Sequence, residues 1–213
     1  MTEFETDKVE RGIFANTKLV LFDVGGILFR FMGGVEALSK LTGYPSAKCE
    51  AIWRDLDDSI CRGITEPQEI WRRIKRNSGY SGVDREFVPI WVDNFQRNDQ
   101  VHKLIKDVAK HHPVGLMTNI YPGVYKKAIE TGNIPNIPYA FVLQSCDTGF
   151  VKPEKQFYEL AEQISGHKPS DILLIDDSPR FIASAQERGW KTYTFNTNSP
   201  DISVSLLRDG FAL

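Results

Sequence analysis

Residues 19–23 read Leu-Val-Leu-Phe-Asp, four apolar residues that stop at an acid. An apolar run of this length is typical of a strand buried on both of its faces. Three more runs share this form and each ends near polar residues: 114–117, 140–143 and 172–175. Residues 193–195, Tyr-Thr-Phe, predict a fifth strand at an edge of the sheet.

Helical patterns separate these runs. Apolar residues with three- and four-residue spacing occupy 101–108 before the second run, 157–164 before the fourth, and 181–185 after it. Strands that alternate with helices are typical of an α/β protein with a doubly wound parallel sheet. We therefore predict this fold, with a Rossmann-like core.

The segment after the first run breaks the alternation. Between residues 31 and 95 no strand pattern stands out, but amphipathic helical patterns occupy 35–41, 52–60 and 70–74. Turn signals such as Thr42-Gly43-Tyr44-Pro45 and Arg62-Gly63 separate them. We predict a small helical cap inserted after the first strand, with residues 30–97 as the cap and residues 1–29 plus 98–213 as the core.

Composition and charge exclude several classes of partner. The 213 residues are 41% hydrophobic and carry a formal net charge of -2, so no general basic field attracts nucleic acid or an anionic membrane. The longest apolar runs are far shorter than the roughly 20 residues that cross a bilayer. Residues 1–18 lack the apolar stretch of a secretory signal. The three cysteines form no metal-binding pattern. These features predict a cytoplasmic protein without a nucleic-acid or membrane partner.

Polar side chains stand where the predicted strands end. Asp23 follows the first run, Thr118 and Asn119 follow the second, and Asp176 and Asp177 follow the fourth. Ligands of an open parallel sheet bind beyond the carboxyl ends of its strands, so these residues are expected to converge. Carboxylates that lie so near one another repel and need a cation between them. Hard oxygen ligands of this kind suit Mg²⁺. The pattern alone equally describes a metal-binding receiver-type domain.

Four segments together resemble the haloacid dehalogenase-like superfamily. Residues 21–29, Leu-Phe-Asp-Val-Gly-Gly-Ile-Leu-Phe, are similar to its first motif, and Met117-Thr118-Asn119 to its second. Residues 149–153, Gly-Phe-Val-Lys-Pro, resemble the third motif, and residues 174–178, Leu-Ile-Asp-Asp-Ser, the fourth. The four occur in the family's order across nearly the whole chain, and the helical insertion lies where the family carries a substrate-covering cap. The resemblance implies a Mg²⁺-dependent phosphatase.

The resemblance also implies a nucleophile and a metal site. Asp23 would attack phosphorus and become an aspartyl-phosphate. Mg²⁺ would be held by Asp23, Asp177 and the carbonyl of Gly25, with Asp176 either a direct ligand or a support behind the ligands. Residues that bind the phosphoryl group, or neutralise its charge, would be Val24, Gly25, Gly26, Thr118, Asn119 and Lys152.

One position departs from the family's pattern. Relatives usually have a second Asp two residues after the nucleophile, which protonates the leaving group and then activates water, and here that position is Gly25. General acid-base help is worth about 10²- to 10⁴-fold. A branch of the superfamily with Gly there includes working phosphatases. A good leaving group such as a sugar 1-phosphate, a cap acid such as Glu66, or a water would compensate. Phe181 stands where relatives often carry Asn or Asp.

Three other interpretations remain open from the sequence. A metal-independent 2-haloacid dehalogenase of the same superfamily would not need Asp176 and Asp177. A catalytically weak binding or regulatory protein would explain Gly25. The strand-end residues are also compatible with turns and helix caps. We expect a small phosphorylated metabolite as the substrate, first a sugar phosphate and second a nucleotide.

Overall fold

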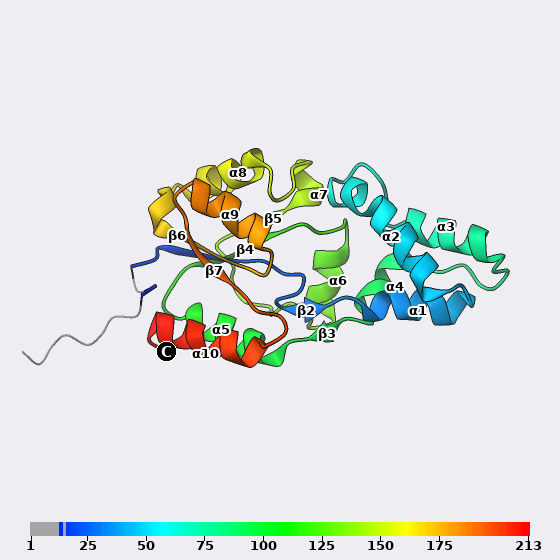
Figure 1. Cartoon of the computed structure of the whole chain (residues 1–213), viewed down its shortest axis with the longest axis horizontal. Helices are drawn as coiled ribbons and strands as arrows, with labels where there is room; N and C mark the ends of the chain where they lie inside the picture. Colours follow the sequence, from blue (N-terminus) through cyan, green and yellow to red (C-terminus); the bar gives the residue numbers. More distant parts are fainter. Residues whose placement is uncertain (1–12, 15) are drawn as a thin grey trace, which may run out of the picture.

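A five-stranded parallel sheet forms the centre of the protein (Figure 1). The computed structural model describes residues 13–14 and 16–213, so most of the N-terminal segment 1–18 and the expectation attached to it lie outside the described residues. The strand order is β5-β4-β1-β6-β7. Their bounds are β1 Leu19–Phe22, β4 Val114–Thr118, β5 Val142–Gln144, β6 Ile172–Asp176 and β7 Lys191–Thr194. This confirms the predicted α/β fold, although β5 begins two residues later than expected and β7 two residues earlier.

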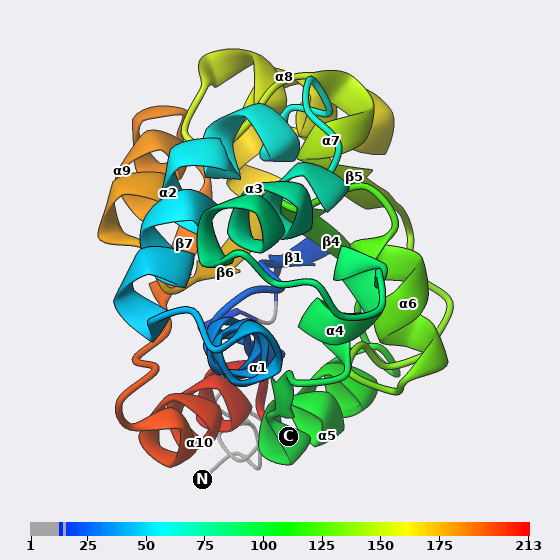
Figure 2. The same cartoon turned by 90° about the vertical axis from the view of Figure 1, so that its right-hand side faces the viewer.

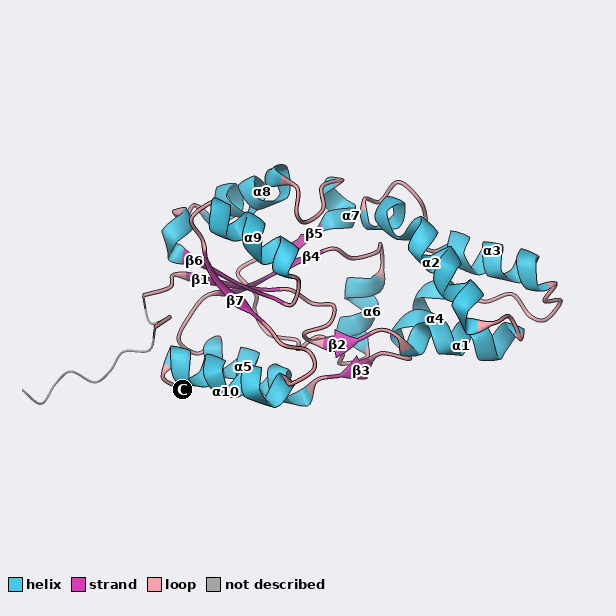
Figure 3. Cartoon of the chain, viewed as in Figure 1, coloured by secondary structure: helices cyan, strands magenta, loops and turns pink. Residues whose placement is uncertain are grey.

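Helices cover both faces of this sheet (Figure 3). Helices α5 (Asp99–Val108) and α10 (Pro200–Phe211) lie on one face, and α8 (Lys155–Ser165) and α9 (Pro179–Glu187) lie on the other. The remaining elements of the core are α6 (Val124–Glu130), α7 (Ser145–Thr148) and the 3₁₀ turn η1 (Pro169–Asp171). No helix in the described part of the chain is both long enough and apolar enough to cross a membrane.

The strand β1 shows why the sheet is buried on both sides. Successive side chains of a strand point to opposite faces. Leu19 and Leu21 belong to an apolar cluster that contains Phe157 of α8, whereas Val20 and Phe22 belong to the larger cluster on the opposite face. An uninterrupted apolar run is what such a strand requires.

The helical insertion, residues 31–95, lies at one end of the core (Figures 1 and 2). It contains α1 (Gly33–Thr42), α2 (Ser46–Cys61), α3 (Gln68–Ser78) and α4 (Phe87–Val92). Two short strands flank it, β2 (Phe29–Arg30) and β3 (Gln96–Arg97), and they pair antiparallel with each other. The sequence did not predict α4, β2 or β3. The division of the chain at residues 30 and 97 into a core and a cap stays a prediction.

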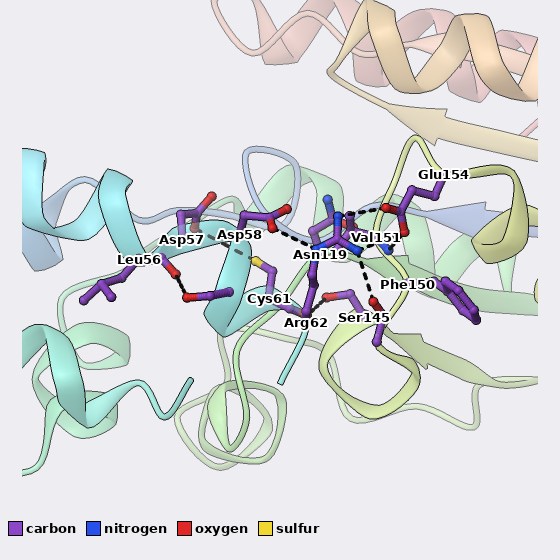
Figure 4. A network of polar contacts seen from close by, with 12 residues as sticks. Leu56, Asp57, Asp58, Cys61, Arg62, Asn119, Ser145, Phe150, Val151 and Glu154 are labelled. Atoms are coloured by element: carbon purple, nitrogen blue, oxygen red, sulfur yellow. Dashed lines mark hydrogen bonds and ion pairs between the residues drawn. The ribbon is translucent and has the colours of Figure 1, made fainter. Parts of the chain in front are cut away.

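The C-terminal end of α2 is fastened to the core. Arg62 donates to the carboxylate of Glu154 at 2.8 Å and to the carbonyl of Gly149 at 3.2 Å (Figure 4). The buried hydroxyl of Ser145 donates to the carbonyl of Cys61 at 2.6 Å. These contacts hold one face of the insertion above the carboxyl ends of the strands.

Candidate active site

A cavity of about 310 Å³ lies between the insertion and the carboxyl ends of the strands. The chain runs from β1 to β4 and β5 on one side, and then crosses to β6 and β7 on the other. Ligands of such sheets bind where the strand order reverses. The predicted site residues that line the cavity are Asp23, Val24, Gly25, Thr118, Asn119, Lys152 and Asp177. Asp176 lies beneath this lining and is fully buried, and Gly26 lines a neighbouring hollow.

Three carboxylates meet in this cavity. Asp23, Asp176 and Asp177 each offer an oxygen atom, and these oxygens lie within 4.8 Å of one another. Burial is the largest cause that raises the pKa of Asp23, to about 7; the charge of Lys152 lowers it, and that of Asp176 raises it. The pKa of Asp177 is also raised, by burial and by Asp176. Without a cation, the repulsion between these carboxylates therefore disfavours the ionised forms of Asp23 and Asp177.

Lys152 is the cation that the chain itself places among these acids. Its Nζ lies 2.9 Å from Oδ1 of Asp23 and 2.5 Å from Oδ2 of Asp176, and its side chain is fully buried. Burial alone would lower the pKa of Lys152, but the charges of Asp176 and Asp23 outweigh burial and raise it. The ammonium therefore stays charged. It also lies 5.0 Å from the centroid of the Phe181 ring, within the range of a cation-π contact.

Asp176 and Asp177 have different surroundings. Both oxygens of Asp176 are engaged, because Oδ2 contacts Lys152 and Oδ1 accepts from the amide of Ser178 at 2.9 Å. Asp177 forms no ion pair with any residue that the structure describes. Its carboxylate lies against the turn at Gly26, where a Cβ atom would stand 2.5 Å from Oδ2 of Asp177. The φ of Gly26 is also 80°, which favours glycine.

The cluster fits a divalent cation. Three acids share a single lysine, so excess negative charge remains in a mostly buried site, and Asp177 has no positive partner among the described residues. All available donors are oxygens, the ligands that Mg²⁺ prefers. The donor set lacks the thiolate and imidazole ligands that favour softer metals.

The family follows from this fold and a comparison of the sequence. A model of the haloacid dehalogenase-like hydrolase family matches residues 17–189. The chain belongs to this family. No curated protein matches the sequence significantly.

Solved structures share the haloacid dehalogenase-like (HAD-like) fold at low sequence identity. An HAD family enzyme from Bacteroides thetaiotaomicron, in complex with magnesium and inorganic phosphate, has a TM-score of 0.71 and 21% identity over 85% of this chain and 95% of that chain. A predicted HAD-like family hydrolase from Porphyromonas gingivalis has a TM-score of 0.69 and 21% identity over 90% of this chain and 98% of that chain. L-2-haloacid dehalogenase from Xanthobacter autotrophicus has a TM-score of 0.62 and 16% identity over 84% of this chain and 77% of that chain.

Two of the predicted phosphate contacts have other partners in this HAD-like hydrolase. The side chain of Asn119 donates to the carbonyl of Lys152 at 3.0 Å and accepts from its amide at 2.8 Å. The amide of Gly26 donates to the carbonyl of Phe29 at 2.9 Å. Asn119 thus holds the main chain that carries the lysine. Among the described residues, the buried hydroxyl of Thr118 has only a weak contact, 3.4 Å to the carbonyl of Asn119.

The insertion supplies the opposite wall of the cavity, which is mostly aromatic. The sequence did not single out this wall as a unit, although the predicted helical pattern at 52–60 contains Trp53. One acid lies in it: Asp57 of α2, which accepts from the hydroxyl of Tyr121 at 2.5 Å. Tyr121 in turn accepts from Nε1 of Trp53 at 2.7 Å. The aromatic residues of the cavity are Phe29, Phe31, Trp53, Trp91, Phe95, Tyr121 and Phe181.

The sequence did not identify Asp57 as an acid of the cavity, and Glu66 was the cap acid predicted instead. Glu66 is exposed, lies 3.6 Å from Arg72 and does not line the cavity. Asp57 stands four residues after Trp53 and four before Cys61, so it shares their face of α2. An acid on the apolar face of a cap helix was the signal that would have found it.

Proposed function

We propose that this HAD-like hydrolase is a Mg²⁺-dependent phosphatase that cleaves small phosphate monoesters through an aspartyl-phosphate on Asp23. The observation that carries the proposal is the cluster of Asp23, Asp176 and Asp177 around Lys152 at the ends of β1 and β6. A carboxylate beside a buried ammonium is suited to attack a dianion that it would otherwise repel. The neighbour from B. thetaiotaomicron, with magnesium and inorganic phosphate bound, supports the same chemistry by analogy.

The residues of the site divide between metal and phosphate. Mg²⁺ would be held by Asp23, Asp177 and the carbonyl of Gly25, and when bound it supplies positive charge to the attacking and transferring oxygens. Asp176 uses both oxygens on other partners and therefore orients Lys152.

The phosphoryl oxygens would meet donors of the chain itself. Thr118, Lys152, Val24 and Gly25 all line the cavity, and their hydroxyl, ammonium and main-chain amides would be these donors. Fixed donors of this kind stabilise charge that develops as the P–O bond breaks. Since Asp23 has a raised pKa in the free site, the cation also favours its ionised, nucleophilic form.

The cavity suits a compact leaving group. Its volume of about 310 Å³ stands at the lower end of the range for small-molecule sites, roughly 300–1,000 Å³. This supports a sugar phosphate ahead of a nucleotide as the substrate, because a nucleobase and ribose together need more room. Aromatic walls such as Trp53 and Trp91 would pack on the apolar face of a sugar ring.

The dehalogenase neighbours favour a second candidate, a 2-haloacid dehalogenase. Its substrate is a carboxylate, and its chemistry replaces halide at carbon without a metal. That metal-independent chemistry has no need of Asp176 and Asp177, whereas a Mg²⁺-dependent phosphatase needs such acids to hold its cation. The phosphatase is therefore the better supported function.

The experiment is release of phosphate from a panel of sugar phosphates and nucleotides, with Mg²⁺ and with EDTA. We expect turnover that needs the metal and disappears in Asp23→Asn, with Asp209→Asn, an exposed acid of α10, as the matched control. Acid-quenched protein should carry a phosphoryl group on the peptide that contains Asp23. Halide release from 2-chloropropionate without metal would replace the proposal by the dehalogenase. Absence of both activities in folded protein would favour a binding protein.

A further inference from the structure

The space beside Gly25 is filled by an aromatic ring. A Cβ atom on Gly25 would stand 3.6 Å from Cε1 of Phe31. The centroid of the Phe31 ring is 5.6 Å from that of Trp53 and 6.3 Å from that of Trp91, so it belongs to the aromatic wall. A Cβ atom at position 25 would therefore be in ordinary van der Waals contact with this wall. Because residue 25 is glycine, this position supplies no carboxyl group, and a general acid must come from another element.

The titratable residues of the cavity leave one candidate. Asp23, Lys152 and Asp177 are engaged in the nucleophile and metal site. Burial raises the pKa of the Cys61 thiol above its ordinary range, and burial together with the Asp57 charge does the same for the Tyr121 hydroxyl. These last two groups are too weakly acidic to exchange protons readily near neutral pH. Among the described residues that line the cavity, Asp57 remains.

We propose that Asp57 is the general acid-base of the phosphatase, an inference that rests on the proposed function. In the first step the Asp23–phosphorus bond forms, the bond from phosphorus to the leaving oxygen breaks, and protonated Asp57 gives its proton to that oxygen. In the second step a water attacks phosphorus, the Asp23–phosphorus bond breaks, and the Asp57 carboxylate takes the proton of the water. Asp57 thereby returns to its first state, with no other reactant needed.

The contacts of Asp57 suit this role. Its Oδ1 accepts from Tyr121, which Trp53 holds in turn, so the carboxyl group has a fixed orientation. The thiol of Cys61 also approaches Oδ1, at 3.9 Å, and Oδ2 accepts no side-chain hydrogen bond from the described residues. One oxygen is thus anchored and the other is available to a leaving group or a water.

The electrostatic surroundings raise the pKa of the Asp57 carboxyl group. Burial is the largest cause that raises the pKa of Asp57; the hydrogen bond from Tyr121 lowers it. The charge of Asp58 raises the pKa, and that of Arg54 and the contact with Cys61 lower it. An acid tuned upward in this way gives up and regains a proton more easily at neutral pH than an ordinary Asp.

The deciding experiment varies the leaving group. Asp57→Asn is compared with Asp55→Asn, an exposed acid of the same helix that pairs with Arg73. First-turnover rates are measured with an alkyl phosphate, whose leaving oxygen needs a proton, and with p-nitrophenyl phosphate, whose leaving oxygen does not. In Asp57→Asn we expect the alkyl phosphate rate to fall by about 10²- to 10⁴-fold while the first turnover of p-nitrophenyl phosphate stays close to that of wild type.

The second step gives an independent readout. With p-nitrophenyl phosphate, Asp57→Asn should release one equivalent of nitrophenolate in a burst and then turn over slowly, because hydrolysis of the aspartyl-phosphate lacks its base. Asp57→Glu should recover part of both rates. An equal loss with both substrates would overturn the proposal, since it would mean that Asp57 only positions the substrate or the helix. Absence of Mg²⁺-dependent turnover in wild type would instead refute the phosphatase itself.

Discussion

Ser145 offers a direct test of how the insertion is fastened to the core. Its hydroxyl is fully buried at the start of α7. It donates to the carbonyl of Cys61 at 2.6 Å and accepts from the amide of Ile120 at 3.0 Å. Within the described part of the chain neither main-chain group has another hydrogen-bond partner. The substitution Ser145→Ala removes one atom and leaves both groups without a partner.

The expected cost follows from these two groups. Leaving one buried polar group unsatisfied costs about 1–3 kcal/mol. Two such groups give a loss of roughly 2–5 kcal/mol in the free energy of unfolding, the lower figure applying where water enters the gap. The missing oxygen is small, so the cavity that it leaves adds little. This loss is large against a total stability of about 5–15 kcal/mol.

Urea unfolding at neutral pH measures the effect, and Ser165→Ala is the matched control. Ser165 also donates to a carbonyl, that of Glu162, and accepts from an amide, that of His167. It lies at the partly exposed end of α8, where water replaces the hydroxyl. We expect a loss below about 1 kcal/mol there. If Ser145→Ala lost no more stability than Ser165→Ala, the two buried bonds would not be what fastens α2.

Three further variants test other contacts. Tyr121→Phe removes a donor that lowers the pKa of Asp57, so the alkaline limb of kcat should move to higher pH; an unmoved limb would contradict the role of Asp57. Glu162→Gln should lower Tm at neutral pH, because the folded-state pKa of this acid is depressed; the difference should vanish as the pH falls below the ordinary value of 4.5. A difference that persists in acid would point to packing. Gly26→Ala should destabilise the fold by about 1–3 kcal/mol and raise the Mg²⁺ concentration for half-maximal activity, since its Cβ displaces Asp177. Unchanged metal dependence would argue against Asp177 as a ligand.

The sheet could be predicted because its central strands are buried on both faces. An apolar run such as 172–175 has no other common explanation when helical patterns flank it. The bounds of the two edge strands, β5 and β7, were harder to predict. Strand β7 begins at Lys191 and Thr192, polar residues that an edge tolerates and that an apolar pattern does not reveal. At β5 the pairing begins with the amide of Ala140, which donates to the carbonyl of Val114. The regular ladder of hydrogen bonds starts only at Val142.

The floor of the cavity could be predicted for a topological reason. Parallel strands bring their carboxyl ends together, so Asp23, Thr118 and Asp176 had to meet whatever the loops do. The opposite wall depends on how α2 docks, and no local pattern encodes that. Glu66 and Asp57 are both acids of the insertion, and only docking separates the exposed one from the one that faces the cavity.

The pairing of β2 with β3 has a consequence for the evolution and engineering of this protein. The chain leaves the core at Arg30 and returns at Gln96, which are partners in the same ladder. To the core the whole insertion is therefore a long hairpin loop, and lengthening such a loop tenfold costs only about 2 kcal/mol of closure entropy. We therefore expect insertions of different size to be exchangeable at this ribbon without a shift in the register of the central sheet. Under the proposed function, in which the insertion covers the substrate, a chimaera that joins a foreign helical segment at β2 and β3 should fold and inherit the donor's choice of leaving group.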